Sequence, residues 1–314
     1  MDRDSGNAID LAALSKRYGR VPAVDGLTLA IRPGESVGLV GPNGSGKSTT
    51  IKMLVGLVRP TSGEGWVFGR SIVRESLEVR RLVGFMPEEV HPYRNMTGRE
   101  YLAFCLSFHG GRGLDRALDL ARKLDLPVDR KTKTYSLGMR VKLGLLQAAA
   151  HGPAVLVLDE ATKGLDPTSR RQVLDLVREE ISRGTTVVLS SHVLSEVERV
   201  CTRTEFIRRG RIVSESERSA ALERLLRVAT VAFEGEVDEG ALRSLPAVSG
   251  VARLGPGFRL TLAGDARETL RALAALPIRS LELRAPGLED LYAELYLADR
   301  AGESGGDGGA GTRP

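Results

Sequence analysis

Short apolar runs alternate with helix-forming stretches from residue 8 to about residue 215 of the chain. Each run has the limited length of a buried strand. The alternation therefore predicts an α/β fold, with a first domain at 8–218. The expected strands lie at 9–11, 27–31, 36–40, 65–68, 83–86, 154–158 and 186–190.

Helical patterns interrupt this alternation before the apolar run at 154–158. Residues 97–124 and 139–150 are almost wholly helical in pattern. We expect them to form a helical subdomain, at about 88–150, inserted into the sheet of the first domain. Residues 206–213 then predict a closing hairpin.

The pattern changes after a charged helix that ends near residue 226, and short elements follow in the order β-α-β-β-α-β. That order is typical of a ferredoxin-like unit and predicts a small α+β domain at 228–298. The Gly-rich residues 301–314 are expected to be a disordered tail. An apolar stripe on the final helix either packs on its own domain or forms a partner surface. The stripe consists of Leu288, Leu291, Tyr292 and Leu295.

The composition is that of a soluble protein, with 42% apolar residues among 314. No apolar run reaches the roughly eighteen residues of a membrane span, and the start lacks a secretory pattern. Cys105 and Cys201 lie far apart in apolar surroundings, which favours buried free thiols in a reducing compartment. The net charge of +5 is modest, and no basic run with interleaved aromatic residues supports nucleic-acid binding. We therefore expect a cytoplasmic protein.

The most specific motif is the octapeptide that begins at Gly41, which fits the phosphate-loop pattern G-x-x-x-x-G-K-[ST]. An apolar strand precedes it and a helix-forming stretch follows, as this loop requires. Its glycines let backbone N–H groups surround a phosphate, Lys47 reaches the β- and γ-phosphates, and Ser48 can bind Mg²⁺. A nucleoside triphosphate is expected to bind here. The predicted contacts are Gly41, Pro42, Asn43, Gly44, Ser45, Gly46, Lys47, Ser48 and Thr49.

Two carboxylates, Asp159 and Glu160, end the apolar run at 154–158. An aspartate at such a strand end in a phosphate-loop enzyme holds Mg²⁺, so Asp159 is a second predicted metal ligand. Glu160 is positioned to act as the general base that activates water. The pair alone is a weak signal, but it becomes strong 112 residues after Lys47 in an alternating chain.

Ser136 is a good N-cap for the helical segment that follows, and the free N–H groups after it form an anion site. Taken alone, this segment is simply a capped helix. Together with the two motifs above, Ser136 and Gly138 resemble the signature Leu-Ser-Gly-Gly-Gln of ABC transporter ATP-binding subunits. In that family the signature completes the ATP site of the opposite subunit. Tyr135, Leu137 and Met139 depart from the pattern.

Further motifs follow in the order of that family. Tyr18 matches the aromatic residue that stacks on adenine, although alone it resembles an ordinary surface tyrosine. Asp166 matches the loop through which two ATP sites communicate, and it also fits as a helix N-cap. His192 matches the switch histidine that contacts the γ-phosphate. The resemblance covers 8 to about 215, and the C-terminal part is similar to the tail of drug-resistance-type export ATPases.

One departure lies where the family usually has a glutamine after the strand at 83–86. Glu88 stands there, and we expect it to contact Mg²⁺ or its water, with a different response to ATP because it is charged. Ala161 replaces a common proline, which is expected only to loosen the local turn.

The resemblance implies ATP and Mg²⁺ as cofactors and Lys47, Glu160 and His192 as catalytic residues. Because one copy carries one phosphate loop and one signature, a second copy is needed to complete each site. The resemblance also implies export through separate transmembrane permease subunits, contacted by the region 88–110, and a location on the inner face of the cell membrane.

Two alternatives stay open at this point. A soluble ABC ATPase acting on ribosomes or DNA usually has two cassettes or a long coiled coil, for which the 88 residues between Lys47 and Tyr135 leave no room. A regulatory ATP-binding module with little turnover is compatible with Met139 and Glu88.

Overall fold

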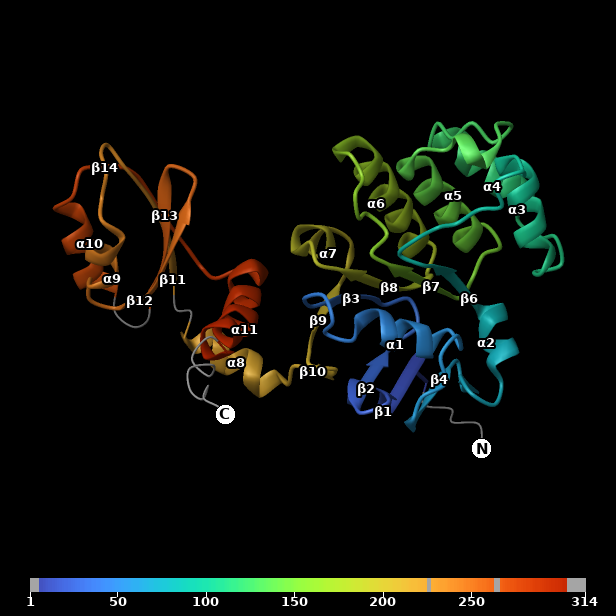
Figure 1. Ribbon diagram of the computed structural model, residues 1–314, viewed down its shortest axis with the longest axis horizontal. Coiled ribbons are helices and arrows are strands. Elements are labelled where there is room, and N and C mark those ends of the chain that lie inside the picture. Colours follow the sequence, from blue (N-terminus) through green and yellow to red (C-terminus); the bar gives the residue numbers. More distant parts are fainter. Residues whose placement is uncertain (1–5, 225–226, 263–265, 304–314) are drawn as a thin grey trace, which may run out of the picture. The chain divides into compact units, whose positions relative to one another are not determined.

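The computed structural model describes residues 6–224, 227–262 and 266–303 (Figure 1). Contacts divide the chain into two compact units, Met1–Ile212 and Val213–Pro314. Each unit has its own sheets and hydrophobic core, so each is described by itself.

A six-stranded sheet, in the order β10-β9-β3-β8-β7-β6, forms the centre of the first unit. All neighbours are parallel except β10, which forms a hairpin with β9 as the sequence predicts. The expected runs at 36–40 and 83–86 are strands with those bounds. The six strands are β3 (Ser36–Val40), β6 (Val83–Met86), β7 (Val155–Asp159), β8 (Thr186–Ser191), β9 (Arg203–Arg208) and β10 (Arg211–Ile212).

The central strands are apolar on both faces because a separate core covers each face. Strands β3, β7 and β8 are buried along their whole length. On β7, Val155 and Val157 join one core, whereas Leu156 and Leu158 join the other, as the two-residue repeat of a strand requires. This explains why the sequence shows them as continuous apolar runs.

The first of these cores lies between the central sheet, α1 (Lys47–Leu54) and an antiparallel sheet in the order β2-β1-β4-β5. Strands β1 and β2 of this sheet are longer than the predicted runs at 9–11 and 27–31, because outside those runs each strand buries only one residue, Leu14 or Val24. The strands of this sheet are β1 (Ile9–Tyr18), β2 (Val21–Ile31), β4 (Ser62–Val67) and β5 (Arg70–Ser71), followed by the helix α2 (Ser76–Leu82).

Helices cover the opposite face of the central sheet (Figure 1). The segment 97–124, expected to be almost wholly helical, is two helices separated by a turn that contains Gly110, Gly111 and Gly113, all at positive φ. A Cβ at Gly113 would lie 2.2 Å from the carbonyl oxygen of Ala150, so only glycine fits. The elements are α3 (Gly98–Ser107), α4 (Leu114–Lys123), η1 (Thr132–Thr134), α5 (Leu137–Ala149), α6 (Pro167–Ser182) and α7 (Leu194–Val200).

The second unit contains an antiparallel sheet in the order β12-β13-β11-β14. With its two intervening helices it has the ferredoxin-like order that the sequence predicts. Its strands are β11 (Arg227–Phe233), β12 (Val248–Leu254), β13 (Gly257–Leu262) and β14 (Ile278–Arg284). Its helices are α8 (Glu215–Arg224), α9 (Glu239–Arg243), α10 (Ala266–Ala274) and α11 (Leu288–Glu303).

The apolar stripe of the final helix packs within its own unit. Leu291 and Leu295 are buried, and α11 contacts α8. The helix continues to Glu303, three residues into the segment 301–314 that was expected as a disordered tail, and 304–314 lie outside the described residues.

Two further expectations concern membrane spans and the cysteines. Within the described part of the chain, no helix has the length and apolar character needed to cross a membrane. Cys105 and Cys201 are both free thiols, as predicted, but each is half-buried and not fully buried as expected. Burial raises the pKa of Cys201 to about 12, so this thiol is unreactive.

Candidate functional site

The phosphate loop joins β3 to α1 at the carboxyl ends of the parallel strands, where ligands of such sheets bind. Two of its glycines are sterically required. A Cβ at Gly41 would lie 2.5 Å from the carbonyl oxygen of Ile207, and one at Gly46 would lie 2.6 Å from that of Ala23. Gly46 also has a φ of 110°, which disfavours any other residue. The loop is therefore held against neighbouring backbone in one conformation.

Lys47 is 5% exposed and points back into this loop. Its Nζ donates to the carbonyl oxygens of Gly41 at 2.7 Å and Pro42 at 3.2 Å, and lies 3.6 Å from Glu160 Oε1. The Oγ of Ser45 is buried and has no hydrogen-bond partner among the described residues. A buried hydroxyl without a partner is costly, so it favours a ligand that supplies an acceptor oxygen. The loop thus fits a phosphate group.

Asp159 is 2% exposed at the end of β7. Its Oδ1 accepts hydrogen bonds from Ser190 Oγ at 2.6 Å and Ser48 Oγ at 3.2 Å. Burial raises the pKa of Asp159, the two hydroxyls lower it, and the carboxylates of Glu88 and Glu160 raise it again. A cation beside these oxygens would lower the pKa of Asp159 again, because it favours the charged carboxylate.

This donor set fits Mg²⁺, which prefers one or two carboxylates together with substrate phosphates and water. Ser48 and Asp159 are the residues that would hold it, and Glu88 lines the same cavity, where it could contact the ion or its water. The described residues contain no cluster of three or more His, Cys, Asp or Glu side chains able to bind a metal alone. The remaining coordination positions would therefore belong to ATP and water.

Glu160 occupies a strained position between two basic side chains. Its φ of 52° lies in the left-handed region, and its N–H contacts the Oγ of Ser190 at 3.0 Å. The side chain is 7% exposed; its Oε2 lies 2.6 Å from His192 Nδ1, and its Oε1 faces Lys47. Strain of this kind persists where surrounding contacts enforce it, and it is concentrated at functional sites.

A cavity of 460 Å³ contains most of the predicted contacts. Tyr18, 52% exposed with the Lys16 ammonium 5.2 Å from its ring centroid, stands at this cavity. Lys163 also lines the cavity and was not among the predicted residues, although its charge four residues after Asp159 was a signal. The lining residues are Tyr18, Ala23, Asn43, Gly44, Ser45, Gly46, Lys47, Ser48, Thr49, Glu88, Glu160 and Lys163.

Ser136, Gly138 and Asp166 do not line this cavity. Ser136 caps α5 by accepting from the N–H of Met139 at 3.3 Å, as predicted. Asp166 caps α6, and hydrogen bonds from Ser169 are the main reason its pKa is lowered. Within one chain, the predicted site is therefore in two separate parts.

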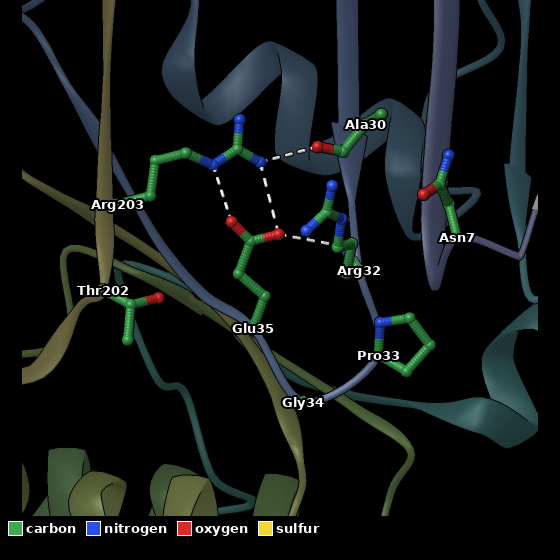
Figure 2. A pocket seen from close by; sticks show the side chains of 8 residues that line it. All are labelled: Asn7, Ala30, Arg32, Pro33, Gly34, Glu35, Thr202 and Arg203. Carbon is green, nitrogen blue, oxygen red and sulfur yellow. Dashed lines mark hydrogen bonds and ion pairs between the residues drawn. The ribbon is translucent and has the colours of Figure 1, made fainter.

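A second cavity, of 710 Å³, lies at the opposite ends of β3 and β9 (Figure 2). Glu35 and Arg203 are already paired there: Glu35 Oε1 lies 2.7 Å from Arg203 Nε, and Arg203 also donates to the carbonyl oxygen of Ala30 at 2.6 Å. Arg32 donates its backbone N–H to Glu35 at 2.9 Å. These contacts connect the ends of β2, β3 and β9, so we attribute a structural role to this second cavity.

Comparisons with known proteins also indicate a nucleotide-binding protein, as the geometry of the phosphate-loop cavity does. Residues 24–163 match the family model described as ABC transporter. The chain is 35% identical to the daunorubicin/doxorubicin resistance ATP-binding protein DrrA of Streptomyces peucetius, over 95% of this chain and 94% of that protein. It is 33% identical to the linearmycin resistance ATP-binding protein LnrL of Bacillus subtilis, over 90% and 96%.

Solved structures are similar to this chain over about two thirds of its length. A structure of an ATP binding subunit of an ABC transporter is 28% identical, with a TM-score of 0.62 over 66% of this chain and 88% of that one. The dimeric cassette MJ0796, at 24% identity and a TM-score of 0.61, shares the fold over 66% of this chain and 97% of its own. The chain therefore belongs to the family of ABC transporter ATP-binding proteins.

Proposed function

We propose that this chain binds and hydrolyses ATP to power export through separate permease subunits. The main observation in support is that Glu160 lies between Lys47 and His192 beside the phosphate loop. Relatives named for antibiotic resistance, which match nearly the whole chain, support the export direction. They lend no support to a ribosome- or DNA-directed ATPase.

The first step is an exchange of partners by Lys47. Its ammonium leaves the carbonyl oxygens of Gly41 and Pro42 and donates to the β- and γ-phosphates, while the loop N–H groups surround them. Ser48 and Asp159 would hold Mg²⁺, which would supply positive charge for the phosphate oxygens. The exposed ring of Tyr18 at the cavity offers a stacking surface for adenine.

The second step is water activation by Glu160. Once Lys47 contacts phosphate, Glu160 Oε1 is free to accept a proton from water that attacks the γ-phosphate. His192, 2.6 Å from Oε2, fixes the orientation of the carboxylate and reaches toward the same phosphate. The strained backbone of Glu160 contributes to this placement.

We infer that a second copy supplies Ser136, Gly138 and Asp166 to the cavity. These residues lie outside the cavity of their own chain, yet Ser136 presents the N-terminus of a thirteen-residue helix. Such an N-terminus favours an anion, and a γ-phosphate contributed by the opposite subunit satisfies it.

The contact with the permease is proposed at an aromatic cluster within 88–110. Tyr93, Phe104 and Phe108 are 57%, 37% and 71% exposed, and their rings meet edge to face at 5.5 and 5.2 Å. Exposed apolar clusters of this kind are typical of protein interfaces. The expected location is thus peripheral, on the inner face of the cell membrane.

The test of the proposed chemistry is Glu160→Gln. Because the amide cannot accept the proton, phosphate release should fall by about a hundred-fold or more, while ATP affinity stays close to that of the original chain. Phosphate release and equilibrium binding of ATP are the two measurements. Turnover at the original rate in this variant would exclude Glu160 as the base.

A further inference from the structure

Glu88 and Lys163 form an ion pair at the phosphate-loop cavity, although 75 residues separate them in the chain. Lys163 Nζ lies 2.5 Å from Glu88 Oε1, and both side chains line the cavity. Glu88 follows β6 and Lys163 follows β7, so two adjacent parallel strands bring the pair together at their carboxyl ends.

The two charges of this pair interact with the other charged residues of the site. Glu88 raises the pKa of the buried Asp159, so its charge acts on the carboxylate expected to hold the metal. The hydrogen bond and charge of Glu88 raise the pKa of Lys163, to which Glu160 and Glu89 add. Lys163 therefore stays protonated and keeps its attraction for Glu88.

A carboxylate at position 88 behaves differently from an amide. It attracts both an ammonium group and a divalent cation, whereas an amide forms no ion pair. Building on the function proposed above, we propose that Lys163 competes with the divalent cation for Glu88, so that cation binding with ATP releases Lys163. Lys163 is thus a positioning residue that sets how the site responds to Mg²⁺.

The released lysine lies on a loop that contacts the signature segment of the same chain. A Cβ at Gly164 would lie 2.8 Å from Leu137 Cδ2, and one at Gly138 would lie 3.7 Å from Leu165 Cδ2. Both loop residues are within two positions of Lys163. Opening the pair therefore gives the loop a new electrostatic environment next to the segment that serves the partner's ATP.

The experiment measures Mg²⁺ dependence of nucleotide binding, not turnover. A fluorescent, non-hydrolysable ATP analogue is titrated with Mg²⁺ against the full chain, Lys163→Ala, Glu88→Gln and the double variant. Lys163→Ala should lower the Mg²⁺ concentration for half-maximal binding by about two- to five-fold, the range of an exposed ion pair. In the Glu88→Gln background, Lys163→Ala should produce no further shift.

Lys123→Ala is the matched control. Lys123 forms a 3.0 Å pair with Glu179 at similar exposure (56% and 42%, against 52% and 38%), but neither lines the cavity. It should leave the titration unchanged. An equal shift from Lys163→Ala in both backgrounds, or no shift in either, overturns the competition. If the original chain fails to bind the analogue with Mg²⁺, the proposed function itself fails, which is a distinct result.

Discussion

Ser190 shows how much of the site depends on a single hydroxyl. Its Oγ donates to Asp159 Oδ1 at 2.6 Å and accepts from the N–H of Glu160 at 3.0 Å, so it holds both carboxylate residues in place. Neither contact is visible in the sequence, where Ser190 is only a polar residue at the end of an apolar run.

We predict that Ser190→Ala lowers the free energy of unfolding of the first unit by about 1 to 3 kcal/mol. The reason is that the buried oxygen of Asp159 and the N–H of Glu160 each lose a partner. Denaturant unfolding checks this, with Ser182→Ala as control, since Ser182 Oγ is exposed and donates only to the carbonyl oxygen of Glu179. Equal stability of the two variants contradicts the prediction.

His151 gives a pH dependence at the residue scale. Its ring stacks on the ring of His109, with 3.8 Å between the centroids. Burial is the main reason that its pKa is lowered to about 4; His109 and Arg116 also lower this pKa, and Gln147 raises it in part. The unfolded chain has the ordinary histidine value of 6.5, so it binds the proton more tightly than the folded chain.

The stability that neutral His151 contributes is therefore complete above pH 6.5 and is lost as the pH falls toward 4. The loss amounts to about 3 kcal/mol at most. Unfolding curves between these values should show a smaller pH slope for His151→Phe than for the original chain. Identical slopes would remove His151 as the cause.

At the scale of elements, the buried carboxylate of Glu196 on α7 connects the segments that carry the site. It accepts hydrogen bonds from Thr162, in the loop after β7, and from Ser191, at the end of β8. Arg170 of α6 lies 3.1 Å away as its ion-pair partner. These contacts fix the loops on either side of Glu160 and His192.

Glu196→Ala is predicted to destabilise the first unit by about 1 to 3 kcal/mol, because the hydroxyls of Thr162 and Ser191 lose their buried acceptor. It should also lower kcat while KM for ATP changes little, since no phosphate contact is removed. Steady-state kinetics at a temperature well below the melting point of the variant measure this. An unchanged kcat in the folded variant would show that the contacts serve stability alone.

The sequence predicts those elements whose signal is local. Strands β3, β6 and β8 follow from short apolar runs, and the motifs at Gly41, Asp159 and His192 meet because parallel strands share one carboxyl edge. The outer part of β1 and the break in 97–124 were missed, since they depend on pairing and on the contact of Gly113 with Ala150. The Glu88–Lys163 pair could not be predicted from the sequence either, because it forms only when β6 and β7 lie side by side in the sheet.

At the scale of the molecule, the proposed shared site predicts complementation between inactive chains. Lys47→Ala removes the phosphate contact, and Ser136→Arg blocks the signature offered to the partner. A mixed dimer keeps one site whose loop and signature are both original. Mixing equal amounts should restore up to about a quarter of the original ATPase rate, since half of the dimers are mixed and each has one of two sites intact.

The two variants measured separately give the baseline for this experiment. A mixture no more active than either variant alone would mean that loop and signature act within one chain.

The cores of the two units are made from separate sets of residues. Among the described residues, the cores of the first unit draw on residues up to Ile212, and a core of the second unit begins at Ala229. A substitution that repacks one unit need not disturb packing in the other. The two units can therefore unfold in separate transitions, so a single melting temperature need not describe the whole chain.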